Sequence, residues 1–299
     1  MKKPLNRTKL VLFSLLGLLT LDRSETARAT ALTWDADTGT TGAQDGSGNW
    51  TGNNWWDAVG LANATWNDAT PDTATIGAAS GVAGTIAVGA NTVGNITFNA
   101  ATSGNYILSG GTLTLSGSPT IAVNNAATIN SILAGTGFTK SGTAALTLGG
   151  VNTFTGNVTV NTVSTLSLAS DSNLGNTANN LAFSTGTGAS TLNLGPGFSS
   201  ASTRTVSINN NRSLYVNATS GTATWNGNLN VGNSAAALRL TCTSGSGAVL
   251  VLGSSAIYNG ASSILYSDNG DIAVDGTINS VSQIQIGRTS TSTKTSSWV

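Results

Sequence analysis

The sequence has no histidine, one cysteine, one methionine and four prolines among its 299 residues, and only 8% of its residues are charged. Without histidine, catalytic triads that depend on it are excluded, and zinc loses a common ligand. A single cysteine cannot form a disulfide within the chain. The charged fraction is far below the roughly 25% of ordinary globular domains, which argues against most helix-rich folds. Because 39% of the residues are hydrophobic and the formal net charge is zero, we expect a folded, β-rich chain and not a disordered one.

Residues 1–29 carry half of the positive charge and have the organisation of a signal peptide. The basic segment Lys2–Lys9 precedes the apolar stretch Leu10–Leu21, and Ala27-Arg28-Ala29 fits a cleavage site. Ala29-Thr30-Ala31 fits one equally well. We therefore expect export, with a secreted or cell-surface location. The alternative is an uncleaved anchor, but the apolar run is shorter than the roughly 20 residues that span a bilayer.

The chain that remains after this leader has six basic residues and ten aspartates, a net charge of −4. Its cations are scattered, whereas binding to phosphate backbones needs clustered ones, so we expect no nucleic-acid partner. Neither of its lysines directly follows a glycine, so it has no phosphate-binding P-loop, and we expect no cofactor. Cys242 follows Leu238 and Leu240 on one strand face and is interpreted as a small core residue, with a reactive or dimerising thiol as the alternative.

From residue 82 onward, pairs of Leu, Val or Ile separated by one residue recur along the chain. A period of two is typical of strands with one buried face, and the Gly, Asn and Ser residues between the pairs are typical of turns. The pairs are Leu113/Leu115, Ile121/Val123, Leu146/Leu148, Val158/Val160, Leu166/Leu168, Leu192/Leu194, Val206/Ile208, Leu214/Val216, Leu229/Val231, Leu238/Leu240, Leu250/Leu252, Ile272/Val274 and Ile284/Ile286.

Two or three such strands per turn of the chain give a repeat of roughly 20 to 25 residues, which indicates a solenoid. We predict an all-β fold: a right-handed parallel β-helix over residues 82–299, in about ten coils that stack roughly 4.8 Å apart. A β-sandwich or an antiparallel barrel is the alternative. The low charge suits stacked coils, because equivalent side chains lie close together and like charges would repel. Neutral Asn side chains are expected to form amide ladders on the outside.

The most specific local pattern runs from Phe138 to Val160 and continues through Leu166-Ser-Leu168 to Leu174-Gly175. Its characteristic residues are Lys140, Gly142, Leu146, Leu148, Asn152, Phe154 and Gly156. The pattern resembles the autotransporter-associated β-strand repeat over about 38 residues, with Ala144 in place of the usual second glycine. In this unit the leucines are expected to fill the core, Gly150 and Asn152 to turn the chain, and Phe154 to add bulk at a corner.

This resemblance implies a parallel β-helical passenger, displayed on or released from a Gram-negative bacterium, with a structural or adhesin-like role. It does not imply catalysis, and we expect a protein that is not an enzyme. Passengers that export themselves end in a β-barrel, whereas this chain ends at Trp298-Val299. We expect either a truncated C-terminus or an outer-membrane translocator that is missing from this chain. Residues 284–289 look like the opening of another repeat, which favours truncation.

Residues 30–81 differ in composition, because they hold five of the seven tryptophans and six of the ten aspartates that follow the leader. We predict that this region is an N-terminal cap that closes the open end of the β-helix. The alternative is a glycan-binding platform formed by Trp50, Trp55, Trp56 and Trp66, because indole faces suit sugar rings. Its partners would be surface glycans, or a host or neighbouring cell surface.

Two groups of aspartates are candidates for chemistry. Asp35 and Asp37 match the first half of a calcium loop, but Gly46 stands where an EF-hand has its bidentate glutamate, so only an irregular metal site remains possible. The second group is Asp268, Asp271 and Asp275. These would supply an acid and a base if the chain were a β-helical polysaccharide lyase or hydrolase, although a solvated turn explains them more simply.

Overall fold

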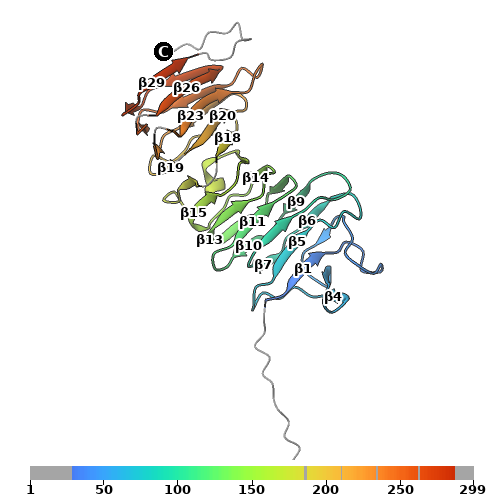
Figure 1. Ribbon diagram of the computed structural model, residues 1–299. Helices are drawn as coiled ribbons and strands as arrows, with labels where there is room; N and C mark the ends of the chain where they lie inside the picture. The colour runs from blue at the N-terminus through green and yellow to red at the C-terminus, as the bar shows by residue number, and fades with distance from the viewer. Residues whose placement is uncertain (1–28, 185–186, 210, 234, 262, 287–299) are drawn as a thin grey trace, which may run out of the picture.

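The computed structural model describes residues 29–184, 187–209, 211–233, 235–261 and 263–286. Apart from Ala29, the predicted signal peptide lies outside the described residues, and so does the C-terminal Trp298-Val299. The described chain is an all-β parallel β-solenoid of about nine turns, close to the ten predicted. Figure 1 shows the coils following one another from the N-terminal to the C-terminal strands in an elongated stack. Within the described ranges, no helix has the length and apolar character needed to cross a membrane.

The strands form three sheets that run along the stack. The 15-stranded sheet contains β1 (Ala31–Trp34), β3 (Trp55–Asp57), β4 (Ala62–Ala64), β5 (Thr73–Ile76), β7 (Ala90–Val93), β8 (Ile96–Phe98), β10 (Thr112–Leu115), β11 (Thr120–Val123), β13 (Ile132–Ser141), β15 (Thr155–Val160), β17 (Leu181–Phe183), β19 (Thr205–Ile208), β22 (Asn228–Val231), β25 (Ile257–Asn259) and β28 (Thr277–Asn279). The 11-stranded sheet contains β2 (Gly48–Asn49), β6 (Thr85–Ala87), β9 (Tyr106–Ser109), β12 (Ala127–Ile129), β14 (Leu146–Leu148), β16 (Thr165–Leu168), β18 (Gly188–Leu194), β20 (Arg212–Ala218), β23 (Ala237–Cys242), β26 (Ile264–Asn269) and β29 (Gln283–Ile286). The three-stranded sheet contains β21 (Thr222–Trp225), β24 (Val249–Leu252) and β27 (Asp271–Val274), and the 3-10 helix η1 spans Asp171–Leu174.

In-register stacking of like residues sets the pairing between coils. Leu146 pairs with Leu166, 20 residues later, and Leu166 pairs with Leu192, 26 residues later. The repeat is therefore longer in places than the sequence pattern suggests, because both the turns and the strands differ in length, from three residues in β14 to seven in β18. A slip of one residue would turn each buried column toward solvent, so the hydrophobic pattern fixes the register.

The prediction that the apolar pairs face inward is confirmed for every pair from Leu113/Leu115 to Leu250/Leu252, whose side chains are all buried. Of the next pair, Ile272 is buried and Val274 is partly buried against the core. Ile284 differs, with 41% of its surface exposed, although it stacks on the inward-facing Leu265. It lies on the last described rung, which has no further described coil to cover it.

The parallel stack begins well before residue 82, where the sequence analysis places the start of the β-helix. Strand β1 already pairs in parallel with β5, and β5 with β8. The short strands β3 and β4 instead add to β1 as antiparallel neighbours and form the N-terminal end of the 15-stranded sheet. Residues 30–81 thus contribute both the first rungs and the hairpin beside them.

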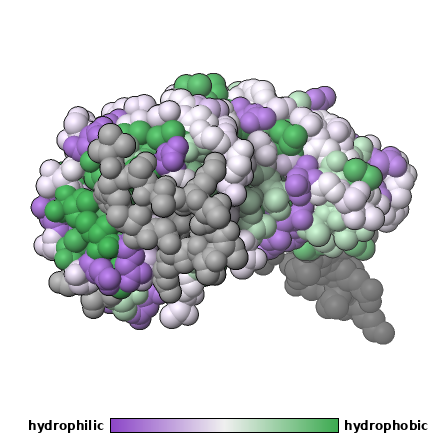
Figure 2. Space-filling model, turned by 90° about the horizontal axis from the view of Figure 1, so that it is seen from above, coloured by the Kyte–Doolittle hydropathy of each residue, from purple (hydrophilic) through white to green (hydrophobic). Residues whose placement is uncertain are grey.

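The predicted amide ladders are present on the outside of the stack. In the 15-stranded sheet, the Asn259 side chain donates to Asn230 at 2.8 Å, and Asn279 donates to Asn259 at 3.3 Å. In the 11-stranded sheet, Asn217 donates to Asn193 at 2.9 Å. Figure 2 shows the resulting surface from one end, mainly near-neutral in hydropathy, with scattered hydrophilic and hydrophobic patches.

Candidate functional site

Lys140, the first of the characteristic residues of the repeat motif, lies inside the solenoid at a position where neighbouring coils have aliphatic side chains. It pairs in register with Ile121 on one side and Val160 on the other. The residue has no exposed surface. Its Nζ donates hydrogen bonds to the carbonyl oxygens of Gly142 at 3.1 Å and Ala144 at 2.8 Å. Lys140 therefore holds the turn that follows β13 from the inside.

Two glycines of the motif occupy positions where another side chain would collide with the preceding coil. Gly142 has a φ of +74°, and a Cβ atom there would lie 2.3 Å from the carbonyl oxygen of Val123. Gly156 has a φ of +127°, and its Cβ atom would lie 2.8 Å from the backbone nitrogen of Gly137. Backbone conformation and close packing thus both require glycine at these positions.

We predict that the stability of the protein rises with pH above about 8 through Lys140. Burial lowers the pKa of Lys140 from 10.5 to about 8. Between these values the unfolded chain keeps a proton that the folded chain has lost, so a higher pH favours the folded state. The neutral amine still has two N–H donors for its two carbonyl partners. The free energy of unfolding should therefore gain about 3 kcal/mol from Lys140 across this range.

Urea unfolding of the wild type and of Lys140→Met, measured from about pH 7 to about pH 10, checks this prediction. Burial raises the pKa values of Cys242 and Tyr258, which lowers stability at high pH, but it does so equally in both proteins. The difference between the two proteins isolates Lys140. A difference that stays constant over the range would contradict the prediction.

Asn152 belongs to a buried pair of amides that joins three consecutive coils. Its Oδ1 accepts a hydrogen bond from the backbone N–H of Leu133 at 2.7 Å, and its Nδ2 donates to the carbonyl of Asn173 at 2.6 Å. The Nδ2 of Asn173 donates in turn to the carbonyl of Gly150 at 2.9 Å. These side chains provide inter-coil hydrogen bonds at a corner where no regular strand pairs.

Phe154 lies at the same corner and has no exposed surface. Its ring centroid is 5.7 Å from that of Phe138, with the two planes at 70°. The carbonyl of Phe154 accepts a hydrogen bond from Nδ2 of Asn179 at 2.9 Å. The leucines of the motif, Leu146 and Leu148, are buried in the adjoining β14. The motif residues thus surround one corner of the core with aliphatic, aromatic and amide groups.

Arg204, which the sequence analysis does not single out, completes this corner from the coil above. Its Nε and Nη2 donate to the carboxylate of Asp171, and its Nη1 donates to the carbonyls of Asn176 at 3.0 Å and Asn179 at 2.9 Å. Nη2 also donates to the carbonyl of Gly175 at 3.2 Å. The guanidinium is fully buried, with all of its nitrogen atoms hydrogen-bonded. The sequence offered one indication of this ion pair. Asp171 is the one acidic residue between Asp72 and Asp268, so any arginine in this part of the β-helix has a single candidate carboxylate nearby in the sequence.

Arg212 is a second fully buried arginine with a different environment. Its Nη1 donates to the carbonyl of Val160 at 3.2 Å. Its Nε and Nη2 have no hydrogen-bond partner. It therefore leaves a charged group poorly compensated inside the solenoid, in contrast to Arg204.

Four of the N-terminal tryptophans pack against one another inside the first coils. The indoles of Trp34, Trp50 and Trp55 have no exposed surface, and Trp66 is 7% exposed. Ring centroids lie 4.6 Å apart for Trp55 and Trp66 and 4.7 Å apart for Trp50 and Trp55. This burial does not fit a glycan platform at Trp50, Trp55 and Trp66, because their faces are covered by protein. Trp56 is partly exposed on β3.

Asp35 and Asp37 use their carboxylates as acceptors for the protein's own donors. Buried Asp35 accepts from the backbone of Asp37 and of Gln44, both at 3.1 Å, and from Nδ2 of Asn63 at 2.6 Å. Asp37 accepts from the backbone of Gly39 at 3.1 Å. N–H donors aimed at these oxygens occupy the positions that a cation would take. Among the described residues, no group of three or more metal-binding side chains comes together.

The aspartates of the enzyme alternative lie near the C-terminal end of the described chain. Asp271 begins β27, pairs in register with Val249 and is exposed, and Asp275 is exposed after that strand. Of the third, Asp268, only the backbone in β26 is described. Cys242 is buried, and its thiol donates to the carbonyl of Asp271 at 3.5 Å.

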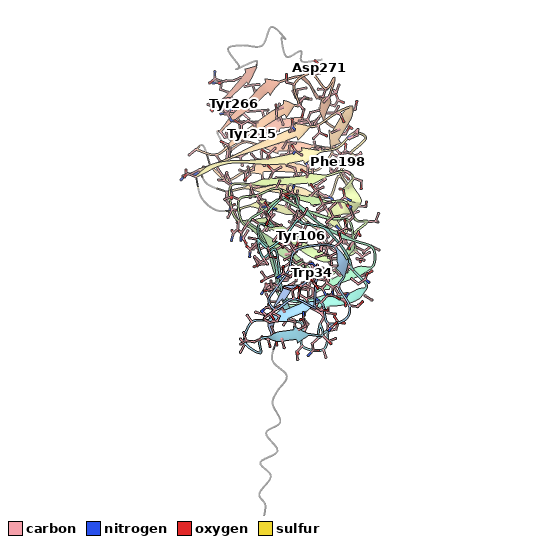
Figure 3. The ribbon with its side chains drawn as sticks, turned by 90° about the vertical axis from the view of Figure 1, so that its right-hand side faces the viewer. Trp34, Tyr106, Phe198, Tyr215, Tyr266 and Asp271 are labelled. Carbon is pink, nitrogen blue, oxygen red and sulfur yellow. The ribbon has the colours of Figure 1, made fainter. Side chains whose placement is uncertain are left out.

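An aromatic and cationic column that the sequence analysis missed lies on the outer face of the 11-stranded sheet. Tyr215, Arg239 and Tyr266 are in register on β20, β23 and β26. The Arg239 guanidinium carbon lies 5.5 Å from the Tyr215 ring centroid and 4.0 Å from that of Tyr266. Figure 3 shows the two tyrosines one above the other along the stack. The sequence could have predicted this column. Tyr215 and Arg239 each lie between the two residues of an apolar pair, and that position faces outward when the pair faces inward.

Comparison with known proteins agrees with this architecture. The chain is 36% identical over 181 residues to the adhesin BmaC autotransporter of Brucella suis biovar 1 (strain 1330). The match covers 58% of this chain and 5% of that protein, so the chain spans a small part of its relative's length. No protein-family model and no solved structure matches the chain. The similarity and the β-solenoid confirm the predicted resemblance to autotransporter passenger repeats.

Proposed function

We propose that the protein is a non-catalytic segment of an exported passenger, which serves as a rigid stalk or an adhesin-like surface at the bacterial cell exterior. The observation that carries the proposal is the continuous parallel solenoid in a chain similar to an autotransporter adhesin. An adhesin must hold its contact surface away from the cell, and a solenoid becomes longer simply by repeating one structural unit.

The outside of the solenoid supports a display role. Its amide ladders, such as Asn230, Asn259 and Asn279, tie successive coils together without charge. Of the four cations whose structure is described, Lys140, Arg204 and Arg212 are buried. The surface of the described residues therefore has few groups that would bind nucleic acid or an acidic polymer nonspecifically.

Three further features belong to this proposal. Residues 1–29 would direct export as a cleaved signal peptide. The coils would wind to the right, because connections between parallel strands of one sheet are right-handed in nearly all proteins. A separate outer-membrane translocator, or sequence beyond this chain, would complete the route to the surface.

Contact with a host or neighbouring cell would use the outer face of the 11-stranded sheet and a surface glycan as its ligand. Tyr215 and Arg239 are partly exposed there, beside the amide side chains of Asn193 and Asn217. Tyrosine and arginine are enriched at binding surfaces, and amides and phenols bind sugar hydroxyls. Trp56 at the N-terminal end is a second partly exposed aromatic residue.

Surface labelling and adhesion measurements test the proposal. An antibody against the chain should label intact cells of the source bacterium, and deletion of residues 2–28 should leave the protein in the cytoplasm. Beads coated with the protein should adhere to glycan-bearing host cells, less so with Tyr215→Ser, and unchanged with the control Thr97→Ser on the outer face of β8. Cytoplasmic wild-type protein would overturn the display role. Surface location without adhesion would reduce the role to that of a stalk.

A further inference from the structure

The carboxylate of Asp45 joins three separate parts of the N-terminal region. Asp45 lies in the loop between β1 and β2, which we define as residues 35–47. Its oxygens accept backbone hydrogen bonds from Ala78 at 2.9 Å, Ser80 at 2.7 Å and Gly81 at 3.1 Å, in the turn after β5. They also accept the hydroxyl of Tyr106, on β9, at 2.7 Å. One side chain therefore holds the loop to the two coils that follow.

Other contacts also join this loop to the solenoid: the backbone N–H of Asp45 donates to Oγ of Ser80 at 2.9 Å, and the backbone N–H of Thr85, on β6, donates to Oγ of Ser47 at 3.0 Å. Strand β2 pairs with β6 through two residues on each side. The backbone N–H of Gly46 donates to the Tyr106 hydroxyl at 3.2 Å, and Trp34 donates through Nε1 to the carbonyl of Gly46 at 3.1 Å. The loop therefore contacts the Trp34 indole through Gly46, and Gly48, which begins β2 directly after the loop, lies against the same indole, since a Cβ atom at Gly48 would lie 2.9 Å from the Trp34 ring. Figure 3 places both Trp34 and Tyr106 in the N-terminal half of the stack.

Within the described part of the chain, Asp45 forms no ion pair. The chain has no lysine or arginine from residue 29 to residue 139, and Asp45 faces one titratable group, Tyr106, on the elements that pack against it. Burial alone would raise the pKa of Asp45. The hydrogen bonds from Tyr106, Ala78, Ser80 and Gly81 together lower the pKa by more than burial raises it, so the pKa lies below the ordinary 3.8. Its stabilising contribution is present above that value and is lost as the pH falls through the folded pKa.

We propose that Asp45 is an acid-sensitive clip, whose protonation releases the loop of residues 35–47 from the turn at residues 78–81 before the rest of the solenoid unfolds. A neutral carboxylic acid accepts backbone N–H groups much more weakly than a carboxylate does. In addition, the added proton makes one carboxyl oxygen a donor, so that oxygen would face a backbone N–H group that is also a donor. Release would uncover one side of the indole cluster.

The coils beyond the N-terminal region have fewer described carboxylates that could be protonated in acid. Their described acidic side chains are Asp171, which pairs with Arg204, and the exposed Asp271 and Asp275. The strands from β14 to β18 contain no titratable carboxylate. Acid should therefore act on the Asp45 contacts while the ladders from β14 to β18 remain intact.

Hydrogen–deuterium exchange of the full chain, corrected for the intrinsic effect of pH, tests the clip. In the wild type, protection of the amides at residues 78–81 should fall roughly ten- to a hundredfold as the pH drops below about 4. Peptides from β14 to β18 should keep their protection. In Asp45→Asn, the 78–81 amides should be poorly protected at neutral pH and show no further loss in acid.

Two more variants separate the clip from a general loss of stability. Tyr106→Phe removes one of the bonds that favours the carboxylate, so release should occur at a higher pH than in the wild type. Asp275→Asn removes an exposed carboxylate at the other end and should leave the wild-type profile unchanged. The proposal is overturned if the wild-type amides at 78–81 stay protected in acid. It is also overturned if their protection disappears only together with that of β14 to β18, or if Asp45→Asn keeps full protection.

Discussion

Replacement of Arg204 by methionine is expected to lower the free energy of unfolding by about 3–5 kcal/mol. The guanidinium is fully buried and satisfies the carboxylate of Asp171 together with the carbonyls of Asn176 and Asn179. Methionine fills much of the same volume but donates no hydrogen bond. The variant would leave a carboxylate and several carbonyls without partners beside a turn that joins two coils.

Arg212 provides a matched control, because it is also a fully buried arginine. Its Nη1 donates to Val160, whereas its Nε and Nη2 have no hydrogen-bond partner. Replacing a poorly compensated buried charge with an apolar side chain of similar size is often neutral or stabilising. Arg212→Met should therefore leave the free energy of unfolding unchanged or raise it. Urea unfolding monitored by circular dichroism gives both values, and equal losses in the two variants would show that burial alone, and not hydrogen bonding, sets the effect.

The two arginines illustrate what the sequence can and cannot predict. The apolar pairs predict the fold well, because a period of two has one physical interpretation when the residues between are Thr, Ser and Asn. They identify Leu146, Leu166 and Leu192 as inward-facing residues, and these do stack in register. The environment of a lone cation depends on the turns of the neighbouring coils. Arg204 and Arg212 look equivalent in the sequence, and coil stacking alone makes one satisfied and the other not.

In the N-terminal region, too, the sequence does not predict the environment of individual side chains. Its tryptophans suggest either a cap or a sugar-binding surface, and composition cannot separate the two. The decisive fact is that Trp34, Trp50 and Trp55 belong to three different segments that fold onto one another. The start of the parallel stack at β1 was missed for a related reason. A long excursion through β3 and β4 separates β1 from its partner β5, so no regular period links them in the sequence.

Lys140 was part of the recognised motif, but its role was not evident from its residue type. A lysine in a sequence of hydroxyl and amide residues would ordinarily be placed on the surface. The register of β13 puts it between Ile121 and Val160 in an inward column. Its carbonyl partners at Gly142 and Ala144 make this position tolerable, and they lie only two and four residues later in the chain. The spacing of lysine and glycine in the motif thus has a direct physical cause.

Phe154→Ala is expected to lower the free energy of unfolding by about 3–5 kcal/mol, because it removes a fully buried ring and leaves a cavity. The ring contacts Phe138, and the glycine at Gly175 gives it room, since a Cβ atom there would lie 3.2 Å from Phe154 Cδ1. The carbonyl of Phe154 accepts hydrogen bonds from the side chain of Asn179 and the backbone of Asn176, and these bonds limit how far the corner can relax into the cavity. The loss should therefore lie in the upper part of the range for large-to-small substitutions.

A graded series makes this prediction specific to the ring. Phe154→Leu keeps most of the volume and should cost less than about 1.5 kcal/mol. Val151→Ala, three residues earlier in the same turn, alters a side chain that is 65% exposed and should change stability by less than about 0.5 kcal/mol. Urea unfolding of the three variants at one pH gives the order. If Phe154→Ala cost no more than Val151→Ala, the corner would have to collapse around the missing ring, and the aromatic position of the repeat would contribute little to stacking one coil on the next.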